Sequence, residues 1–107
     1  MKITNKNNMT VLVHKEPCEE NDPIFAVNVE AACEAIEILS EDAYNLWCYL
    51  AKNPEGHTVK LSLDDVAKRG FKESSFYKSM DELTKLGYIS DLGRDVFIFY
   101  ENRSFNF

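Results

Sequence analysis

The sequence has less positive charge than a protein needs to bind DNA mainly by neutralising phosphates. Its 107 residues contain 12 lysines and arginines against 18 aspartates and glutamates, a formal net charge of −6. Proteins that hold a duplex through its phosphates show the opposite balance. The acidic excess lies outside positions 58–94, where there are seven basic and six acidic residues. The overall charge therefore argues against strong non-specific DNA binding, whereas the charge of this segment does not.

Long apolar runs and paired cysteines are also missing. No stretch is apolar over enough residues to cross a bilayer, and residues 1–8 lack the apolar centre of a signal peptide, so we expect no membrane partner and a cytoplasmic location. The three cysteines, Cys18, Cys33 and Cys48, are widely spaced, which argues against a disulfide framework and favours a reducing compartment. Cys33 and Cys48 fall on the apolar faces of two expected helices, and we expect both to be small buried residues.

The sequence also lacks the patterns of metal sites and catalytic sites. Its cysteines and its two histidines, His14 and His57, do not occur at the short spacings of closed zinc sites. Carboxylates are plentiful, but there is no nucleophile with a placed base and no phosphate-binding loop. Capping of a helix accounts for Asp64 and Asp65. We therefore expect no metal, no cofactor and no enzymatic activity.

The N-terminal third alternates between extended and helical patterns. Residues 1–8 are polar and predict an arm, while Met9–His14 and residues 24–29 carry the apolar pattern of strands on either side of an acidic loop. Apolar residues at helical spacing then predict a helix over 29–39, with Val29, Ala32, Cys33 and Ile36 along its apolar stripe.

A second helix has a clear beginning and end. Ser40 is a good N-cap residue, and the two carboxylates that follow it suit the positive end of a helix dipole. The helix should end near Lys52, because Pro54 restricts the residue before it. Thr58–Leu61 is then expected to be extended and to pair with the final hairpin. The apolar stripe of this helix comprises Ala43, Leu46, Trp47 and Leu50.

The stretch from 61 to 100 predicts two helices followed by a hairpin. Ser62 and Asp65 have the spacing of a capping box, and Leu61 and Val66 occupy the positions of a hydrophobic staple. Gly70 is placed to end this first helix in a left-handed conformation. A longer helix, ended by Gly87, has its core stripe at Phe76, Met80 and Leu83, and two strands at 88–90 and 96–100 flank a turn at 91–94.

The return strand at 96–100 reads VFIFY and is apolar on both faces. Because an exposed hairpin normally alternates, we expect something to cover its outer face. The alternatives are the strand Met9–His14, the tail residues Phe105 and Phe107, or a second subunit. An exposed strand of this kind could also add a strand from a partner protein.

From position 39 to position 100 the chain resembles the winged helix-turn-helix domains of bacterial, phage and plasmid replication initiators, DnaD-type N-terminal domains among them, and of small transcriptional regulators. The matching segments are LSEDAYNLWCYLAKN, LSLDDVAKRGFKESSFYKSMDELTKLGYI and SDLGRDVFIF. The resemblance implies an α+β fold, mainly helical, with a C-terminal β-hairpin wing. An extra N-terminal strand region adds to it: we expect residues 1–23 to form an arm, a short strand and an acidic loop, and residues 24–107 to form the winged helix-turn-helix, in one compact unit.

The resemblance also implies which side chains face double-stranded DNA. These are residues of the second helix of the pair together with an arginine at the wing tip: Lys72, Ser74, Ser75, Tyr77, Lys78, Lys85 and Arg94. Serines near a helix N-terminus can help to hold a phosphate, and an arginine on a wing can enter a minor groove. Two features depart from the family pattern: Lys72 stands where a capping Ser or Thr is usual, and Glu73, Asp81 and Glu82 lie among the basic residues.

Two functions follow as hypotheses. The first is a small DNA-binding protein of phage, plasmid or bacterial origin that acts in replication initiation or transcription regulation as a homodimer. The alternative is an acidic winged-helix protein interaction module, or a phage inhibitor, that does not bind DNA and contacts its partner through the strand at 96–100. The net charge of −6 and the acidic N-terminal third motivate this alternative.

Overall fold

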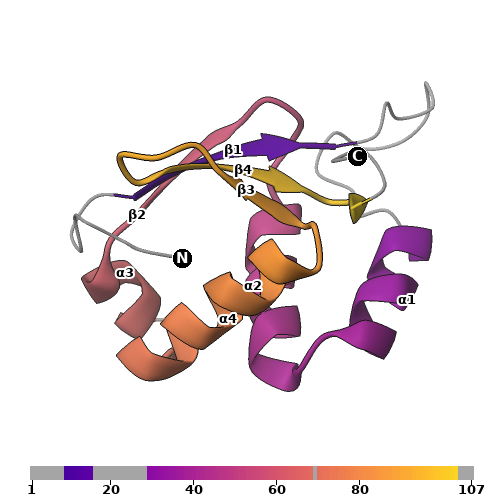
Figure 1. The fold of residues 1–107 in the computed structure, drawn as a ribbon, viewed down its shortest axis with the longest axis horizontal. Helices are drawn as coiled ribbons and strands as arrows, with labels where there is room; N and C mark the ends of the chain where they lie inside the picture. The colour runs from indigo at the N-terminus through magenta and orange to yellow at the C-terminus, as the bar shows by residue number, and fades with distance from the viewer. Residues whose placement is uncertain (1–8, 16–28, 69, 104–107) are drawn as a thin grey trace.

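The computed structural model describes residues 9–15, 29–68 and 70–103, and within them it has an α+β fold of four helices and a four-stranded mixed sheet (Figure 1). The expectations for residues 24–28, for Cys18 and for the tail phenylalanines lie outside the described residues. The elements run in the order β1 (Met9–His14), α1 (Val29–Ile38), α2 (Glu41–Ala51), β2 (Thr58–Leu61), α3 (Leu63–Lys68), α4 (Glu73–Lys85), β3 (Ile89–Asp91) and β4 (Val96–Tyr100).

The N-terminal strand β1 lies inside the sheet, whose order is β2-β1-β4-β3. It runs antiparallel to β2, with Val11 opposite Val59, and parallel to β4, with Val11 opposite Phe97. The expectation that Thr58–Leu61 pairs with the hairpin is therefore wrong, because β1 occupies that place. The alternating pattern of β1 explains its place inside the sheet. Every second side chain, beginning at Met9, is fully buried, so one face of the strand packs against the core along its length.

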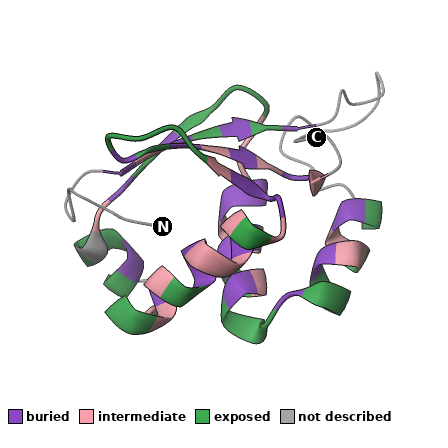
Figure 2. Ribbon diagram, in the orientation of Figure 1, coloured by how far each residue is buried: buried purple, intermediate pink, exposed green. Residues whose placement is uncertain are grey.

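The described helices all lie on one side of the sheet and leave its other face without a helical cover (Figures 1 and 2). The core sits between the two layers. Trp47 of α2 lies at its centre, with its ring edge-on to Phe99 of β4 at 6.3 Å between ring centres. The predicted core stripes of α2 (Ala43, Leu46, Trp47, Leu50) and α4 (Phe76, Met80, Leu83) are buried as expected.

For the helix pair, the predicted start of α3 and the predicted ends of both helices are confirmed. The Asp65 N–H donates to Ser62 Oγ at 3.1 Å, and the staple residues Leu61 and Val66 are both buried. Gly70 has φ +91°, a conformation that favours glycine, and the N–H of Phe71 reaches back to the Val66 carbonyl at 3.1 Å. This is the Schellman arrangement, and Gly87 ends α4 in the same way.

The hairpin differs from the expectation at β4. This strand pairs with β1 on one edge and with β3 on the other, so it cannot add a partner strand, and that part of the interaction hypothesis is wrong. Neither does β1 cover the outer face of β4, because the two strands lie side by side. On that face Val96 is exposed and Ile98 and Tyr100 are half-buried. The first hairpin strand is Ile89–Asp91, one residue later than predicted.

Helix α1 presents a different face to the core from the one predicted. Ala31 and Ala35 are buried, whereas Val29 and Ile36 of the predicted stripe are 74% and 60% exposed. Cys33 is exposed and Cys48 of α2 is half-buried, so the expectation that both are buried is wrong. Ala31 and Ala35 lie on the side of α1 opposite Val29 and Ile36, so the buried side of the helix carries small residues and the larger apolar residues lie outside.

A buried ion pair lies at one end of the sheet. Lys15 follows β1 and Glu101 follows β4, and their charged groups lie 3.3 Å apart with both side chains 2% exposed. The Lys15 ammonium also donates to the Ala51 carbonyl at 2.7 Å, at the end of α2. The pair therefore joins three elements that are distant in the sequence.

Candidate nucleic-acid interface

Helix α4 has an outer face that carries three of the predicted DNA-contacting residues. Ser74, Lys78 and Lys85 are exposed and recur at spacings of four and seven, which places them along one line of the helix. The buried stripe of α4 points the opposite way, toward α2 and the sheet. The structure thus brings two lysines and a serine hydroxyl together on one outward surface.

Lys72 stands at the N-cap position of α4, as its place in the sequence suggests. Its backbone is extended (φ −78°, ψ 150°), and its exposed side chain makes no capping hydrogen bond. The first N–H groups of a helix attract anions, and a lysine beside them adds charge of the same sign. Ser75, in the first turn, is half-buried and lies off the line of Ser74 and Lys78.

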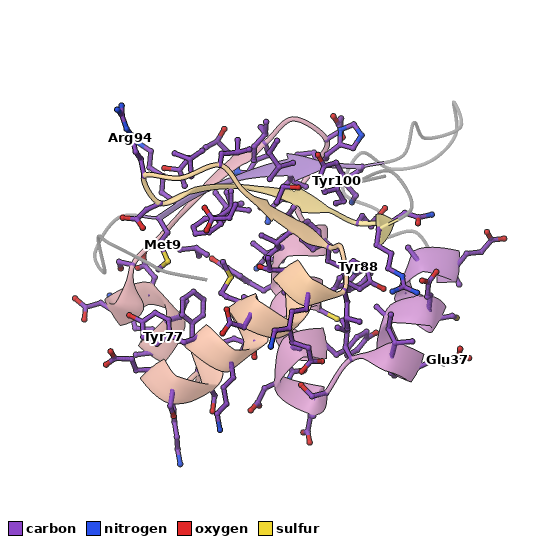
Figure 3. All side chains as sticks on the ribbon, viewed as in Figure 1. Met9, Glu37, Tyr77, Tyr88, Arg94 and Tyr100 are labelled. Carbon is purple, nitrogen blue, oxygen red and sulfur yellow. The ribbon has the colours of Figure 1, made fainter. Side chains whose placement is uncertain are left out.

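Tyr77 is not on the outer face, and the expectation that it points away from the core is wrong. Its half-buried ring packs against the core, 5.9 Å between centres from the Phe76 ring. Its hydroxyl oxygen is buried without a hydrogen-bond partner among the described residues. Figure 3 shows the ring between α3 and α4, so the neighbouring helix accounts for its burial.

Arg94 lies in the β3–β4 turn and is remote from the α4 lysines. It is exposed and has φ 55°, and Figure 3 shows it projecting from the sheet on the side turned away from the helices. The turn is fixed locally, because the Gly93 N–H donates to the Asp91 carboxylate at 2.9 Å. Arg94 therefore projects away from the helix layer that contains α4.

The carboxylates of α4 have separate surroundings. Glu82 accepts two hydrogen bonds from Ser40 at the start of α2, from its N–H at 2.7 Å and from its hydroxyl at 2.8 Å. Ser40 Oγ in turn accepts from the Ala43 N–H at 3.3 Å and so caps α2. Sequence reasoning missed this contact, because nothing in the local pattern links positions 40 and 82. Asp81 remains on the side of α4 that bears Lys78 and Lys85.

Those two lysines line a broad depression of about 640 Å³ between α4 and the α1–α2 junction. The rest of its lining is formed by Ile38, Ser40, Asp81, Glu82 and Leu86. The basic groups of α4 therefore stand beside a concave surface with two carboxylates, Asp81 and Glu82, of which Glu82 is hydrogen-bonded to Ser40. This geometry suits a phosphate backbone running along the helix, because the two ammonium groups are presented on one side.

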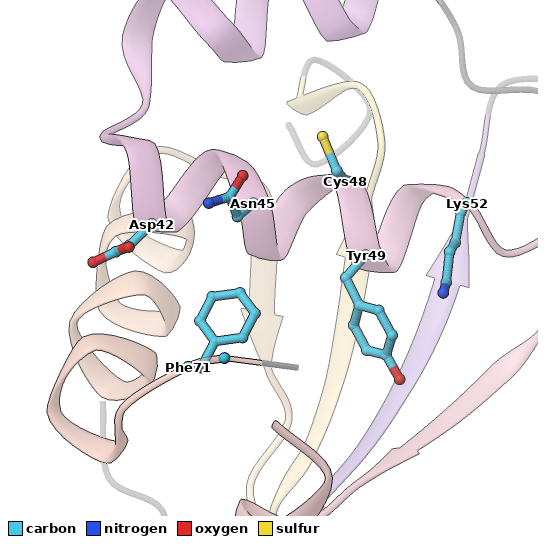
Figure 4. Close-up of a pocket in the computed structure, with 7 residues that line it drawn as sticks. Asp42, Asn45, Cys48, Tyr49, Lys52 and Phe71 are labelled. Carbon is cyan, nitrogen blue, oxygen red and sulfur yellow. The ribbon is translucent and has the colours of Figure 1, made fainter. Parts of the chain in front are cut away.

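A second cavity, of about 390 Å³, lies between α2 and the turn that precedes α4 (Figure 4). Its lining includes Asn45, Tyr49 and Phe71. The Lys52 ammonium lies 4.6 Å from the centre of the Tyr49 ring, a cation–π distance. Phe71 packs against the core beside this cavity. The cavity therefore lies where the turn between α3 and α4 meets α2.

Two tyrosines have perturbed acidities. The pKa of Tyr88 is raised to about 12, mainly by burial and in part by the Glu34 carboxylate, while Arg103 acts to lower it. The Tyr88 hydroxyl is buried without a hydrogen-bond partner among the described residues. A hydrogen bond with Cys48 is the main cause that raises the pKa of Tyr44, with burial next. Neither group lies on the outer face of α4.

Within the described ranges, no helix has the length and apolar character to span a membrane, and no cluster of three or more His, Cys, Asp or Glu side chains could hold a metal ion. Comparisons of the chain with protein-family models, with curated proteins and with solved structures found no significant match. The interface described above therefore rests on the geometry and charge of the chain itself.

Proposed function

We propose that this protein is a small DNA-binding protein of the winged helix-turn-helix type, with α4 as the helix that contacts double-stranded DNA. The observation that carries the proposal is the outer face of α4, where Lys78 and Lys85 are exposed on one line with Ser74. In helix-turn-helix proteins the second helix of the pair enters the major groove, and its outward side chains contact bases and phosphates.

The electrostatics of this helix support the proposal locally, although the whole chain is acidic. Glu82, the carboxylate nearest to α2, is hydrogen-bonded to Ser40 and so is directed to the helix junction. Lys72 adds a positive charge at the N-terminus of α4, where free N–H groups can hold a phosphate. The contacts that we propose are therefore Lys72, Ser74, Lys78 and Lys85.

The biological role that we propose is replication initiation or transcription regulation in a phage, plasmid or bacterial setting, within the cytoplasm. Both roles require recognition of a particular sequence, and α4 has few side chains with which to read bases. A homodimer would double the contacts and favour a site with two-fold symmetry. The resemblance of positions 39–100 to replication initiators motivates this role.

The experiment is a selection from random DNA duplexes at low salt, followed by affinity measurements on the enriched sequence. We expect an enriched site, and we expect the double variant Lys78→Ala/Lys85→Ala to bind it at least about tenfold more weakly. Lys60→Ala is the matched control, because Lys60 is exposed on β2 and points away from the helix layer. Failure to enrich any sequence or to bind any duplex would end the proposal.

A second candidate is a protein interaction module that does not bind DNA. The net charge of −6 favours it, together with the uncovered sheet face where Leu12 and Val96 are 39% and 36% exposed. A partner would then cover the face of β4 rather than extend its edge. Recovery of a protein and no nucleic acid with the purified chain would favour this candidate.

A further inference from the structure

The outward side of α1 is a contiguous apolar surface. Val29, Ala32, Cys33 and Ile36 of α1 and Tyr44 of α2 surround a depression of about 300 Å³. Single exposed apolar residues are ordinary, whereas apolar residues that gather round one hollow form a candidate interaction site. Figure 1 shows α1 at the end of the helix layer, beside α2, and Figure 2 shows exposed residues along it.

The shape of this surface fits a helix. The depression lies between α1 and Tyr44 of α2, and the groove between two packed helices can receive the side-chain ridge of a third. Helix α1 has 10 residues, about 15 Å at the usual rise per residue, so a partner helix would contact it over two to three turns. Apolar residues spaced by three and four on that partner would reach Val29 and Ile36.

The charge around the groove indicates which charge a partner should carry. Helix α1 contains three glutamates and no basic residue. Glu30, Glu34 and Glu37 follow one another at spacings of four and three, so they lie along one side of α1, beside the apolar residues. Glu34 pairs with Arg103 at 2.7 Å, whereas Glu30 and Glu37 are exposed and have no ion-pair partner among the described residues. A partner that carries lysines or arginines beside its apolar stripe would match them.

The same charges argue against a second copy of this chain as the occupant. Two α1 helices packed antiparallel across this surface would bring the Glu30 and Glu37 side chains of both copies to one seam. Like charges placed together oppose association, and α1 offers no basic residue to balance them. We propose that the α1–α2 groove, formed by Val29, Ala32, Cys33, Ile36 and Tyr44, binds a cationic amphipathic helix of a partner protein. This site is separate from the α4 face and is independent of DNA binding.

The test uses two fluorescent 18-residue peptides with the same leucine stripe, one with lysine and one with glutamate at the remaining positions. We expect the lysine peptide to bind at least about tenfold more tightly than the glutamate peptide. Ile36→Asp should weaken its binding about tenfold or more, because a large apolar contact is lost. Leu92→Asp is the matched control: Leu92 is 59% exposed in the β3–β4 turn, and its change should leave the affinity within about twofold.

Both positions are exposed, so circular dichroism should show that each variant folds. A Glu30→Gln/Glu37→Gln variant should bind the lysine peptide more weakly and with less dependence on salt. The Lys78→Ala/Lys85→Ala variant should keep peptide binding, and Ile36→Asp should keep DNA binding, so the two proposals can fail separately. The inference is overturned if neither peptide binds, if both bind equally, or if Ile36→Asp and Leu92→Asp have the same effect. It is also overturned if light scattering shows a dimer that Ile36→Asp dissociates, because the occupant is then a second copy.

Discussion

Removal of one partner from the buried Lys15–Glu101 pair should cost a large part of the stability of the fold. In Glu101→Gln the shape of the side chain is kept, while the Lys15 ammonium, 2% exposed, retains the Ala51 carbonyl but loses its counter-charge. Breaking a buried ion pair from one side typically costs about 3–5 kcal/mol, because a charge is left without compensation. Domains of this size unfold with a free energy of about 5–15 kcal/mol, so the loss is about a fifth of the total or more.

The assay is equilibrium unfolding in urea, followed by the fluorescence of Trp47, the single tryptophan. It is a suitable probe because its indole N–H donates to the Glu101 carbonyl at 3.3 Å. The double variant Lys15→Met/Glu101→Leu should recover most of the loss, to within about 1–2 kcal/mol of the natural chain, since no isolated charge remains.

The control is Glu34→Gln, which breaks the Arg103–Glu34 pair at side-chain exposures of 34% and 43%. A partly exposed pair of this kind contributes about 0–1 kcal/mol. If Glu101→Gln costs no more than Glu34→Gln, the reasoning about burial at the end of the sheet is refuted.

Three further predictions concern α2, the tyrosines and the hairpin. Ser40→Ala should cost about 1–2 kcal/mol in the same urea assay, because α2 loses its cap and Glu82 loses a donor; a change under about 0.3 kcal/mol would contradict this. The pKa of Tyr88 is raised to about 12 in the folded protein, mainly by burial, so the unfolded chain loses the hydroxyl proton at a lower pH than the folded chain does. The contribution of Tyr88 to stability is therefore fully present below pH about 10 and is lost as the pH rises toward 12. The loss amounts to at most about 3 kcal/mol. Tyr88→Phe should reduce that alkaline loss, as thermal melts from pH 8 to 11.5 would reveal; equal alkaline loss in the natural chain and in Tyr88→Phe would contradict the assignment. Arg94→Ala should leave the DNA affinity within about twofold, as we also expect for Lys60→Ala, because Arg94 projects away from the helices. A loss of affinity as large as that of Lys78→Ala would show that the hairpin reaches the duplex.

The sequence predicts the ends of the helices well, because these are decided by neighbouring residues. Ser40 caps α2 and Ser62 caps α3 through hydrogen bonds to groups three residues away. Gly70 and Gly87 end their helices in the left-handed conformation that other residues adopt at a cost. Each of these signals lies within a few positions and needs no knowledge of the remaining fold.

The order of the strands could not be predicted in the same way. The alternating pattern of Met9–His14 identifies a strand with one buried face, but not the strands beside it. In the structure its neighbours are β2 and β4, both far along the chain. The burial of Lys15 follows from that placement, and a lysine after a strand gives no sign of it in the sequence. Pairing over long separations depends on the whole core.

The buried face of α1 was predicted wrongly for a related reason. Helical spacing selects the larger apolar residues, Val29 and Ile36, as the core stripe, whereas the core receives Ala31 and Ala35. Which face is buried depends on where α1 packs against the rest of the fold, and that position is not encoded in the helical spacing itself. A sequence pattern records which residues share a face, but not which of two apolar faces another helix will cover.

The candidate site was predictable only on α4. Once Phe76 and Met80 are assigned to the core, the spacing of the helix fixes Lys78 and Lys85 on the outer surface. Tyr77 depends on where α3 packs, and Arg94 depends on the direction of the hairpin turn. Both are properties of neighbouring elements, and the resemblance to winged-helix domains does not determine them.

The salt dependence of DNA binding tests the central claim most directly. For the selected duplex, the logarithm of the affinity should fall linearly with the logarithm of the salt concentration, with a slope of about 0.9 for each phosphate contact. We predict that Lys78→Ala/Lys85→Ala reduces this slope by about 1.8, and that Lys60→Ala leaves it unchanged. Equal slopes for the natural chain and the double variant would contradict a role for α4 in binding DNA.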